Sequence, residues 1–366
     1  MLSSTSSSDQ RLPRLPWKLL LGGAGLILLS FVLGLEMILA ARGYRADAVD
    51  GHLLWIEQRM RVDPLQTRAL VLVGASRMRL DTDLAVLRAR TGLEPVQLAI
   101  TGSSFLPVLR DLASDPAMRG TVLVDYTDGA VAQPDVEDAA EVYVAAYEKR
   151  RAHPRLPDFS VAEDFLTALQ HRHLRSFADG ATPLDSLMLR AFVADSTQQY
   201  LITLPDRSQL ADYRKVAMPE FYYRRVVRNL AQPVIMPPAV SYAALEADLK
   251  ARIQGLTPVV AAGYFEGATE VARLAKTIEA RGGRVLFVVM PTSGYVREID
   301  DRRFPRRQYW DAFVALTSAK TLHFEDVPAM RALVCPDGSH LDYRDRARFT
   351  VSLVEALKLE RAQLMP

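Results

Sequence analysis

The stretch ALVLVGASR, residues 69–77, is an apolar run closed by glycine and followed by serine and arginine. A short, continuous apolar run that ends at glycine is typical of a parallel strand buried on both faces. The same pattern returns in PVQLAI (95–100) and TVLV (121–124), with helical patterns between the runs. Three strand–helix alternations in so short a stretch predict an α/β fold with a central parallel sheet.

This alternation stops near residue 130 and resumes near residue 263. Residues 130–255 are helical in patches and rich in proline, so we interpret them as a large, mostly helical insertion. The remaining pattern predicts strands over 284–290 and 322–325. It predicts helices over 81–91, 103–113, 263–281, 307–318 and 342–364. The mixed-charge run 300–307 is expected to be a solvated loop.

The N-terminus carries a segment that is apolar enough to enter a membrane. Leu19–Leu35 has no charged residue, and a helix over 19–41 would be about 34 Å long against a hydrocarbon core of about 30 Å. The alternative is a cleaved signal peptide, whose apolar region is usually shorter, about 7–15 residues. Basic residues before the helix favour a cytoplasmic N-terminus.

We therefore divide the chain into four parts. They are a cytoplasmic tail over 1–18, a single transmembrane helix over 19–41, a stalk over 42–68 and a main domain over 69–366. This organisation predicts a protein of the bacterial inner membrane with its main domain in the periplasm.

Charge and cysteine content exclude several classes of protein. The chain has 45 basic and 43 acidic residues, a formal net charge of +2, which argues against a nucleic-acid partner. The single cysteine, Cys335, permits no intrachain disulfide and no cysteine-based zinc site. We expect neither a metal nor a cofactor.

Polar residues follow the expected strands at the edge where parallel sheets bind ligands. Ser76 follows the first strand, Gly102 the second and Asp128 the third, while Asp337 and His340 share the loop before the last helix. A serine needs an imidazole as base, and that imidazole needs an acceptor that holds its tautomer. The sequence thus predicts a catalytic set of Ser76, His340 and Asp337, with backbone amides at Ser76 and Gly102 facing an oxyanion.

Each of these residues also has a structural interpretation. Ser76 can cap a helix, Gly102 can serve a turn, and Asp337 and His340 can be satisfied loop residues.

The motifs resemble those of the SGNH hydrolases. GASR (74–77) is similar to their first block, Gly102 stands in the place of the second, and DGSHL (337–341) is similar to the last. The third block normally supplies an asparagine, whereas this chain has DYTDG (125–129), in which Asp128 is the candidate for that oxyanion position. The resemblance implies a three-layer α/β/α, flavodoxin-like fold.

The resemblance also implies a function. It suggests a membrane-anchored serine O-acyl esterase or acyltransferase that modifies a cell-envelope or exported polysaccharide through an acyl-Ser76 intermediate, alongside other polysaccharide-assembly proteins. In the insertion, Tyr222, Tyr223 and Arg225 are expected to contact the polymer, because aromatic rings and guanidinium groups suit sugars. The alternative is a catalytically silent protein of this fold that binds glycan or organises an export complex. The missing asparagine favours that alternative.

Overall fold

A five-stranded parallel sheet forms the centre of the protein. The computed structural model describes residues 16–132, 138–152, 159–193, 198–237, 241–260 and 263–359. The strand order is β2-β1-β3-β6-β7, and every neighbouring pair is parallel. The strands are β1 (Ala69–Val73), β2 (Glu94–Gln97), β3 (Thr121–Asp125), β6 (Arg284–Val289) and β7 (Lys320–His323). The predicted α/β class with a central parallel sheet is confirmed.

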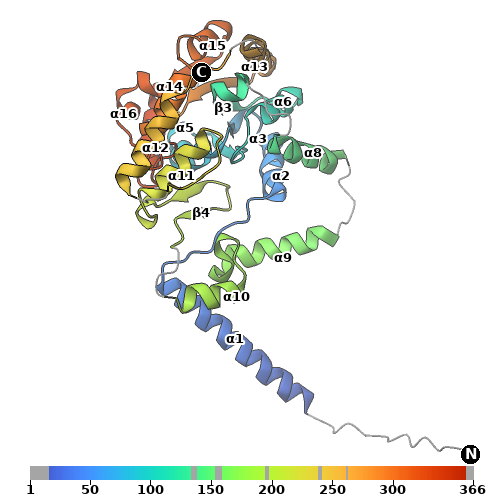
Figure 1. The fold of residues 1–366 in the computed structure, drawn as a ribbon. Helices are drawn as coiled ribbons and strands as arrows, with labels where there is room; N and C mark the ends of the chain where they lie inside the picture. The colour runs from blue at the N-terminus through green and yellow to red at the C-terminus, as the bar shows by residue number, and fades with distance from the viewer. Residues whose placement is uncertain are drawn as a thin grey trace, which may run out of the picture.

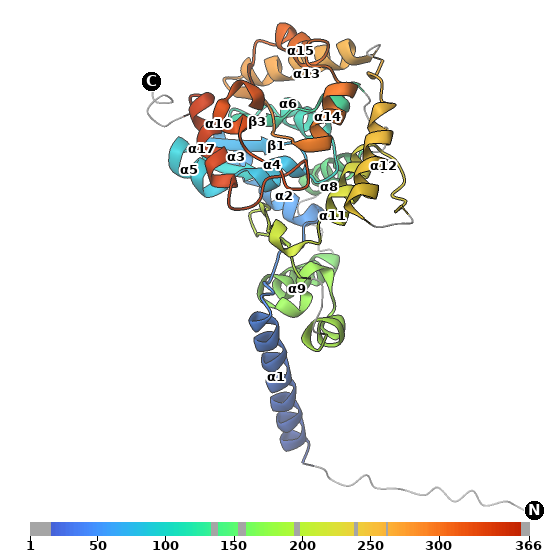
Figure 2. The ribbon, with the colours of Figure 1, turned by 60° about the vertical axis from the view of Figure 1, so that its left-hand side comes forward.

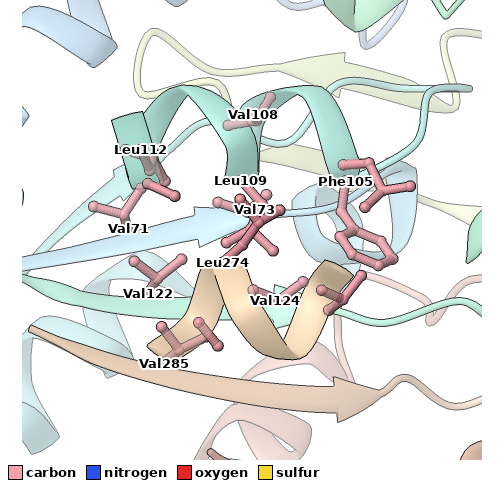
Figure 3. Packing of buried hydrophobic residues seen from close by; sticks show 14 of the residues in the cluster. Val71, Val73, Phe105, Val108, Leu109, Leu112, Val122, Val124, Leu274 and Val285 are labelled. Atoms are coloured by element: carbon pink, nitrogen blue, oxygen red, sulfur yellow. The ribbon is translucent and has the colours of Figure 1, made fainter. Parts of the chain in front are cut away.

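Helices cover both faces of this sheet, which explains why its central strands β1, β3 and β6 are mostly apolar. Val71 and Val73 of β1 pack into one buried cluster and Leu70 and Leu72 into another, since successive side chains alternate between faces. Figure 3 shows the first cluster between β1, α6 and α13. The first face carries α2 (His52–Met60), α6 (Leu106–Ser114), α8 (Ala139–Ala152), α13 (Tyr264–Glu279) and α15 (Trp310–Leu316). The second carries α4 (Ser76–Asp81), α5 (Leu84–Thr91), α16 (Pro328–Arg331) and α17 (Arg346–Ala356).

The N-terminal apolar helix projects from this body. It is α1 (Trp17–Ala41), and its length and hydropathy are sufficient to cross a membrane. Most of its side chains are exposed, unlike those of a core helix. Figure 1 shows α1 extending away from the sheet and its helices.

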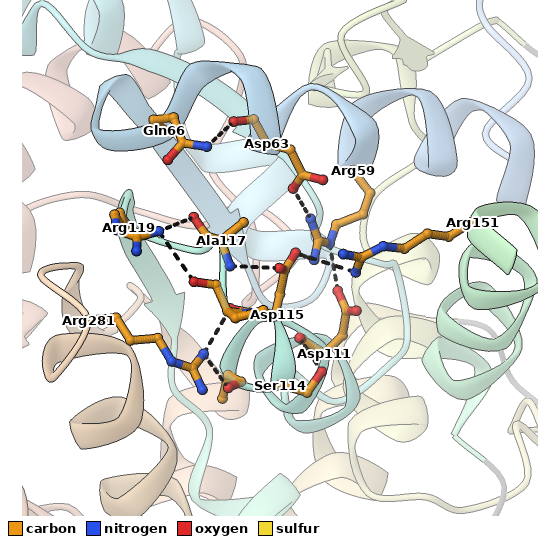
Figure 4. Close-up of polar contacts among 12 residues, drawn as sticks. Arg59, Asp63, Gln66, Asp111, Ser114, Asp115, Ala117, Arg119, Arg151 and Arg281 are labelled. Atoms are coloured by element: carbon orange, nitrogen blue, oxygen red, sulfur yellow. Dashed lines mark hydrogen bonds and ion pairs between the residues drawn. The ribbon is translucent and has the colours of Figure 1, made fainter.

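The expected stalk over 42–68 is wrong from His52 onward. The side chain of Trp55 in α2 is wholly buried, and its Nε1 donates a hydrogen bond to the Leu98 carbonyl at 2.8 Å. The guanidinium of Arg59 is also buried and binds the carboxylates of Asp111 and Asp115 at 2.6 and 2.7 Å (Figure 4). Helix α2, together with α3 (Val62–Leu65), therefore belongs to the body, because its apolar face meets α8 and the sheet.

Two local expectations near the site also differ from the structure. The helix expected over 81–91 is α5, which begins only at Leu84, where the Asp83 side chain accepts hydrogen bonds from the Ala85 and Val86 amides. A separate helix that was not expected, α4, begins at Ser76 and ends at Asp81. The mixed-charge run that was expected to be a loop begins inside a helix, α14 (Gly294–Arg303), whose apolar residues Val296 and Ile299 are buried.

The insertion consists of helices and one hairpin that the sequence pattern missed. Its described helices of eight or more residues are α8, α9 (Phe159–His173), α11 (Glu220–Asn229) and α12 (Tyr242–Gln254). The antiparallel hairpin pairs β4 (Leu201–Thr203) with β5 (Gln209–Ala211). Helices α11 and α12 pack against α14 around a separate apolar cluster, so the insertion is attached to the edge of the sheet that carries the polar loops.

A buried ionic cluster joins the insertion to α4. The Asp50 carboxylate accepts hydrogen bonds from Arg79 at 2.5 Å and from Arg207 at 2.7 Å, and both arginine side chains are almost wholly buried. Arg79 also donates to the Thr101 hydroxyl at 2.8 Å, and Arg207 donates to the Gln97 carbonyl at 2.8 Å. The cluster therefore holds α4, the loop after β2 and the hairpin in one arrangement.

Replacing Asp50 by alanine should destabilise the body strongly, because two buried guanidinium groups lose their only shared counter-charge. Removing one member of a buried ionic cluster costs about 3–5 kcal/mol. The matched control is Glu355→Ala, which removes an exposed partner of Arg90 and should cost about 1 kcal/mol or less. Thermal unfolding of the full chain in detergent measures both. Equal shifts for the two variants would show that Asp50 does not hold the cluster.

Candidate active site

Ser76 lies at the carboxyl edge of the sheet, where the strand order reverses between β1 and β3 and where ligand sites form in such sheets. It is the first residue of α4 and is half-buried. The turn before it requires Gly74, whose φ is +149° and where an added Cβ would lie 2.6 Å from the Asp125 Cβ. The strand–glycine–serine–helix order therefore presents the Ser76 hydroxyl at the end of β1.

The structure brings Ser76, His340 and Asp337 into one hydrogen-bonded chain. His340 Nε2 lies 2.8 Å from Ser76 Oγ, and His340 Nδ1 lies 2.8 Å from Asp337 Oδ2. The carboxyl of Asp337 is fully buried and the imidazole nearly so. This geometry allows the imidazole to accept the serine proton while the carboxylate holds its tautomer and stabilises its charged form.

The loop that carries His340 is fixed to the rest of the sheet edge by four hydrogen bonds. The Ser293 hydroxyl donates to the Cys335 carbonyl at 2.9 Å and accepts from the Cys335 amide at 3.0 Å, and the Ser293 amide donates to the Gly338 carbonyl. Farther along, the Leu341 amide donates to Asp81 Oδ1 in α4 at 2.8 Å. These bonds set the distance between the imidazole and the serine helix.

Cys335 is a buried residue of this loop. Its side chain is buried, and its thiol lies 3.4 Å from the Pro291 carbonyl oxygen. Burial, with smaller effects of nearby carboxylates, raises the pKa of the Cys335 thiol well above its usual value. The thiol is thereby disfavoured as a nucleophile.

The Asp337 carboxylate is held in its charged form by four hydrogen bonds and one ion pair. Oδ1 accepts from the backbone amides of Ser339 and His340 at 3.0 and 2.8 Å. Oδ2 accepts from the His340 ring and from the Tyr213 hydroxyl at 2.9 Å, and the Arg225 Nε lies 3.2 Å from it. Burial alone would raise the pKa of Asp337, but the contacts with His340, the Ser339 amide and the charge of Arg225 lower it to about 2.

Tyr213 is the site residue that sequence reasoning missed. It lies just after the hairpin, in a short 3-10 turn, and is buried. Burial and the neighbouring Asp337 raise the pKa of its phenol, so the hydroxyl stays protonated and donates. No local motif marks it, because its partner lies 124 residues farther along the chain.

The three insertion residues expected to contact the polymer differ in their exposure and in their bonding partners. Arg225 is partly exposed and reaches Asp337, with its guanidinium 5.9 Å from the Phe221 ring centre. The Tyr222 hydroxyl accepts from the Tyr295 amide at 2.8 Å. Tyr223 is buried, and its hydroxyl donates to Asp248 and to a backbone carbonyl, so its role is to join α11 and α12. The expectation that Tyr223 lies at a polymer-contacting surface is wrong, because its ring fills the cluster between those helices.

The loop after β2 meets the serine turn as expected. The Ile100 amide donates to the Gly74 carbonyl at 2.9 Å, and Gly102 follows two residues later with a φ of +76° and an exposed backbone. The first amides of α4, Ser76 included, have no acceptor within that helix. Both sets of amides therefore belong to the same edge of the sheet.

Asp128, the third oxyanion candidate, is engaged elsewhere. Its Oδ1 accepts from the Tyr264 hydroxyl at 2.9 Å, and burial raises the pKa of Asp128 to about 7. The acidic group beside the serine turn is Asp125 instead, whose Oδ2 lies 3.6 Å from the Arg77 Nε. Burial raises the pKa of Asp125, and Arg77 and the Ala75 amide oppose that rise.

A cavity of about 240 Å³ begins at Arg77, the residue after Ser76. It lies where β3 and β6 end, between Asp128 and Asp300, and the rings of Phe304 and Trp310 form part of its wall. Burial raises the pKa of Asp300 to about 6, with Arg77 opposing the rise. The cavity thus combines carboxyl, guanidinium and aromatic groups, which suit a ligand rich in hydroxyls.

Within the described residues, no group of three or more histidine, cysteine, aspartate or glutamate side chains is arranged to hold a metal ion. Neither a family model nor a curated protein sequence matches this chain. The geometry of Ser76, His340 and Asp337 is therefore the observation from which its chemistry follows.

Replacing Arg225 by methionine should reduce stability in a pH-dependent way. The folded-state pKa of Asp337 is about 2 against an ordinary value of 3.8, so its ionisation contributes about 2 kcal/mol above pH 4 that is lost as the pH falls through about 2. Without Arg225 the folded pKa rises and part of this contribution disappears. The loss relative to the unsubstituted chain should be full at pH 7 and shrink toward pH 2.

Denaturant unfolding in detergent at pH 7, 4 and 2 measures this difference. Arg224→Met on the same helix is the matched control, because Arg224 is exposed and no contact with Asp337 is present. A penalty for Arg225→Met that is the same at all three pH values would contradict the proposed charge interaction.

Proposed function

We propose that this protein is a membrane-anchored serine O-acyl esterase or acyltransferase of the SGNH type. The observation that carries the proposal is the chain of two 2.8 Å contacts from Ser76 through His340 to an ionised, buried Asp337. The order β2-β1-β3-β6-β7 supports it, because it corresponds to the flavodoxin-like order implied by the resemblance, and Ser76 lies at the switch point of that order.

The reaction uses only groups of this chain. Ser76 Oγ attacks the acyl carbon while His340 Nε2 takes the hydroxyl proton. The tetrahedral intermediate then expels the sugar alcohol, which leaves with the proton from His340, and an acyl ester remains on Ser76. Water or a second sugar hydroxyl attacks this ester and gives its proton to His340. The bond from the acyl carbon to Ser76 Oγ then breaks, the acyl group leaves on the acceptor, and His340 returns the proton to Oγ. Asp337 remains ionised throughout and stabilises the imidazolium.

The oxyanion is assigned to backbone amides. The amides at Ser76 and Gly102 come from the two loops that meet at the carboxyl edge of β1 and β2. No asparagine follows β3, and the carboxyl of Asp125 in that place is paired with Arg77. The developing charge is therefore stabilised by fewer donors than in a site that has the asparagine side chain.

The substrate class is part of the proposal and is supported by the cavity that begins at Arg77, the residue after Ser76. We assign an acylated cell-envelope or exported polysaccharide, since the cavity beside Arg77 offers carboxyl, guanidinium and aromatic groups for sugar hydroxyls and rings. Helix α1 would hold the body at the periplasmic face of a bacterial inner membrane, near other proteins that assemble the polymer.

A second candidate function is that of a catalytically silent protein of the same fold that binds glycan or organises an export complex. The lack of the asparagine after β3 favours it. The two functions differ in one property, because only the enzyme has a serine that reacts.

Ser76→Ala should abolish covalent labelling by a fluorophosphonate, because the serine oxygen is the attacking atom. Asp337→Asn should keep the fold but slow the turnover of a small aryl ester by as much as about 10⁴-fold, because the imidazolium loses its counter-charge. Ser339→Ala, a serine of the same loop, is the matched control and should keep its labelling. Mass spectrometry of the labelled peptide identifies the site.

Labelling that persists in Ser76→Ala, or a chain that never takes the label although it is folded, would favour the silent protein. Release or transfer of acyl groups on an acylated polysaccharide, compared with the aryl ester, tests the substrate class separately.

The proposed topology predicts an active periplasmic reporter. Alkaline phosphatase fused after Pro366 should be active in a bacterial cell, since the body lies outside the cytoplasm, and the same enzyme fused after Lys18 should be inactive. The reverse pattern would place the body in the cytoplasm. A mature N-terminus near Arg42 would show that α1 is removed as a signal peptide.

A further inference from the structure

An apolar surface is exposed on the insertion segment that follows α9. This juxtamembrane segment, residues 175–193, contains η2 (Arg175–Gly180), α10 (Pro183–Asp185) and η3 (Ser186–Ala191). Four of its large apolar side chains are at least 60% exposed: Leu184, Met188, Leu189 and Phe192. Water-soluble surfaces rarely gather large apolar side chains so closely unless they bind something.

The opposite side of this segment packs on the body-proximal end of α1. Ala191 and Leu187 contact Leu35, Leu39 and Tyr44 in one apolar cluster. Figures 1 and 2, which differ by a 60° turn, both place the segment around α10 beside this end of the helix. The exposed side chains of the segment therefore continue the exposed apolar surface of α1.

The one acidic residue of α1 is used to make this junction. The Glu36 carboxylate is buried and accepts hydrogen bonds from the backbone amides of Arg175 and Ser176 at 2.8 and 2.9 Å, with the Arg175 guanidinium 3.6 Å away. A carboxylate near the end of an apolar helix is costly unless it is paired in this way. The segment is thus attached to α1 by a specific polar contact as well as by apolar packing.

Arginines border the apolar surface on the side of the body. Arg42, just after α1, donates to the Val193 carbonyl at 2.6 Å. Arg190 donates to the Ala178 carbonyl at 2.8 Å and stacks over the Tyr44 ring at 4.9 Å. Cationic and tyrosine side chains at the end of an apolar helix are typical of the headgroup region of a bilayer.

We propose that residues 183–193 lie in the lipid bilayer as a second membrane contact beside α1, with Leu184, Met188, Leu189 and Phe192 among the acyl chains. The proposal rests on α1 spanning a membrane and is independent of the chemistry at Ser76. Lipid is the occupant that fits, because the surface is continuous with α1 and bordered by arginines. The one acidic residue of 183–193 is Asp185 near its start, whose carboxylate accepts hydrogen bonds from Thr182, and Ser186 to Val193 contain none. The contact restrains the tilt and rotation of the body relative to the bilayer, in addition to α1 itself.

Fluorescence quenching in vesicles tests the proposal. Single cysteines in place of Met188 and Phe192 would carry an environment-sensitive fluorophore in the full chain, reconstituted in phosphatidylethanolamine and phosphatidylglycerol vesicles with acyl-chain nitroxide lipids. Leu28→Cys in α1 is the membrane reference. Leu316→Cys in α15, at the far end of the body in both views, is the aqueous reference. The unsubstituted chain is the labelling blank, since Cys335 is buried.

Probes at 188 and 192 should be quenched several-fold more than the probe at 316, and to an extent approaching that at 28. Quenching at 28 alone would overturn the proposal while leaving α1 in the membrane. No quenching at 28 would overturn both. A blue-shifted but unquenched probe at 188 would show that a second copy, rather than lipid, covers the surface.

A second measurement needs no substitution. The unsubstituted chain in vesicles that contain an acyl-chain photoactivatable phospholipid should form crosslinks in peptides from α1 and from 183–193, and none in α15. Crosslinks restricted to α1 would overturn the proposal, even if the labelled variants had failed to fold.

Discussion

The buried carboxylate of Asp337 is the group on which the site depends. Burying a charge is unfavourable unless donors or opposite charges surround it. Four hydrogen bonds and the Arg225 guanidinium converge on this carboxylate from the His340 loop and the insertion. The same bonds orient the imidazole toward Ser76. One set of contacts therefore keeps Asp337 ionised and holds His340 in position to accept the serine proton. The sheet supplies the serine, but these contacts position its partner.

This arrangement gives the insertion a part in the chemistry. Tyr213 and Arg225 both come from the stretch that interrupts the α/β pattern, and both reach Asp337 Oδ2, the oxygen that also meets the His340 ring. The Asp50 cluster attaches the hairpin before Tyr213 to α4, the helix that begins at Ser76. A displacement of the insertion would therefore be transmitted to the acid and to the serine turn together.

The N-terminal region also contains a buried carboxylate that depends on contacts with the insertion. Glu36 is acceptable in α1 because backbone amides of the insertion solvate it, and those amides are available because the insertion folds back onto the helix. The linker and Asp50 then connect this junction with the body. The linker after α1 thus contacts the insertion and, through Asp50, the helix that begins at Ser76.

The sequence alone was enough to predict what depends on local pattern. Ala69–Val73 is predicted to be a strand because a short apolar run closed by glycine is typical of a strand covered on both faces. The apolar length of α1 and the grouping of Ser76, Asp337 and His340 at one edge also followed from pattern and strand polarity.

The tertiary structure alone decided the contacts made across long stretches of chain. Asp128 bonds to Tyr264, Tyr223 fills the space between two helices, and Tyr213 reaches Asp337, although nothing in the neighbouring residues distinguishes one outcome from another. His52–Met60 likewise has the amphipathic pattern of a surface helix, and its membership of the body depended on where α8 and the sheet offered an apolar surface. Periodicity specifies which side of an element is buried, whereas the partner that buries it is set only when all elements pack together.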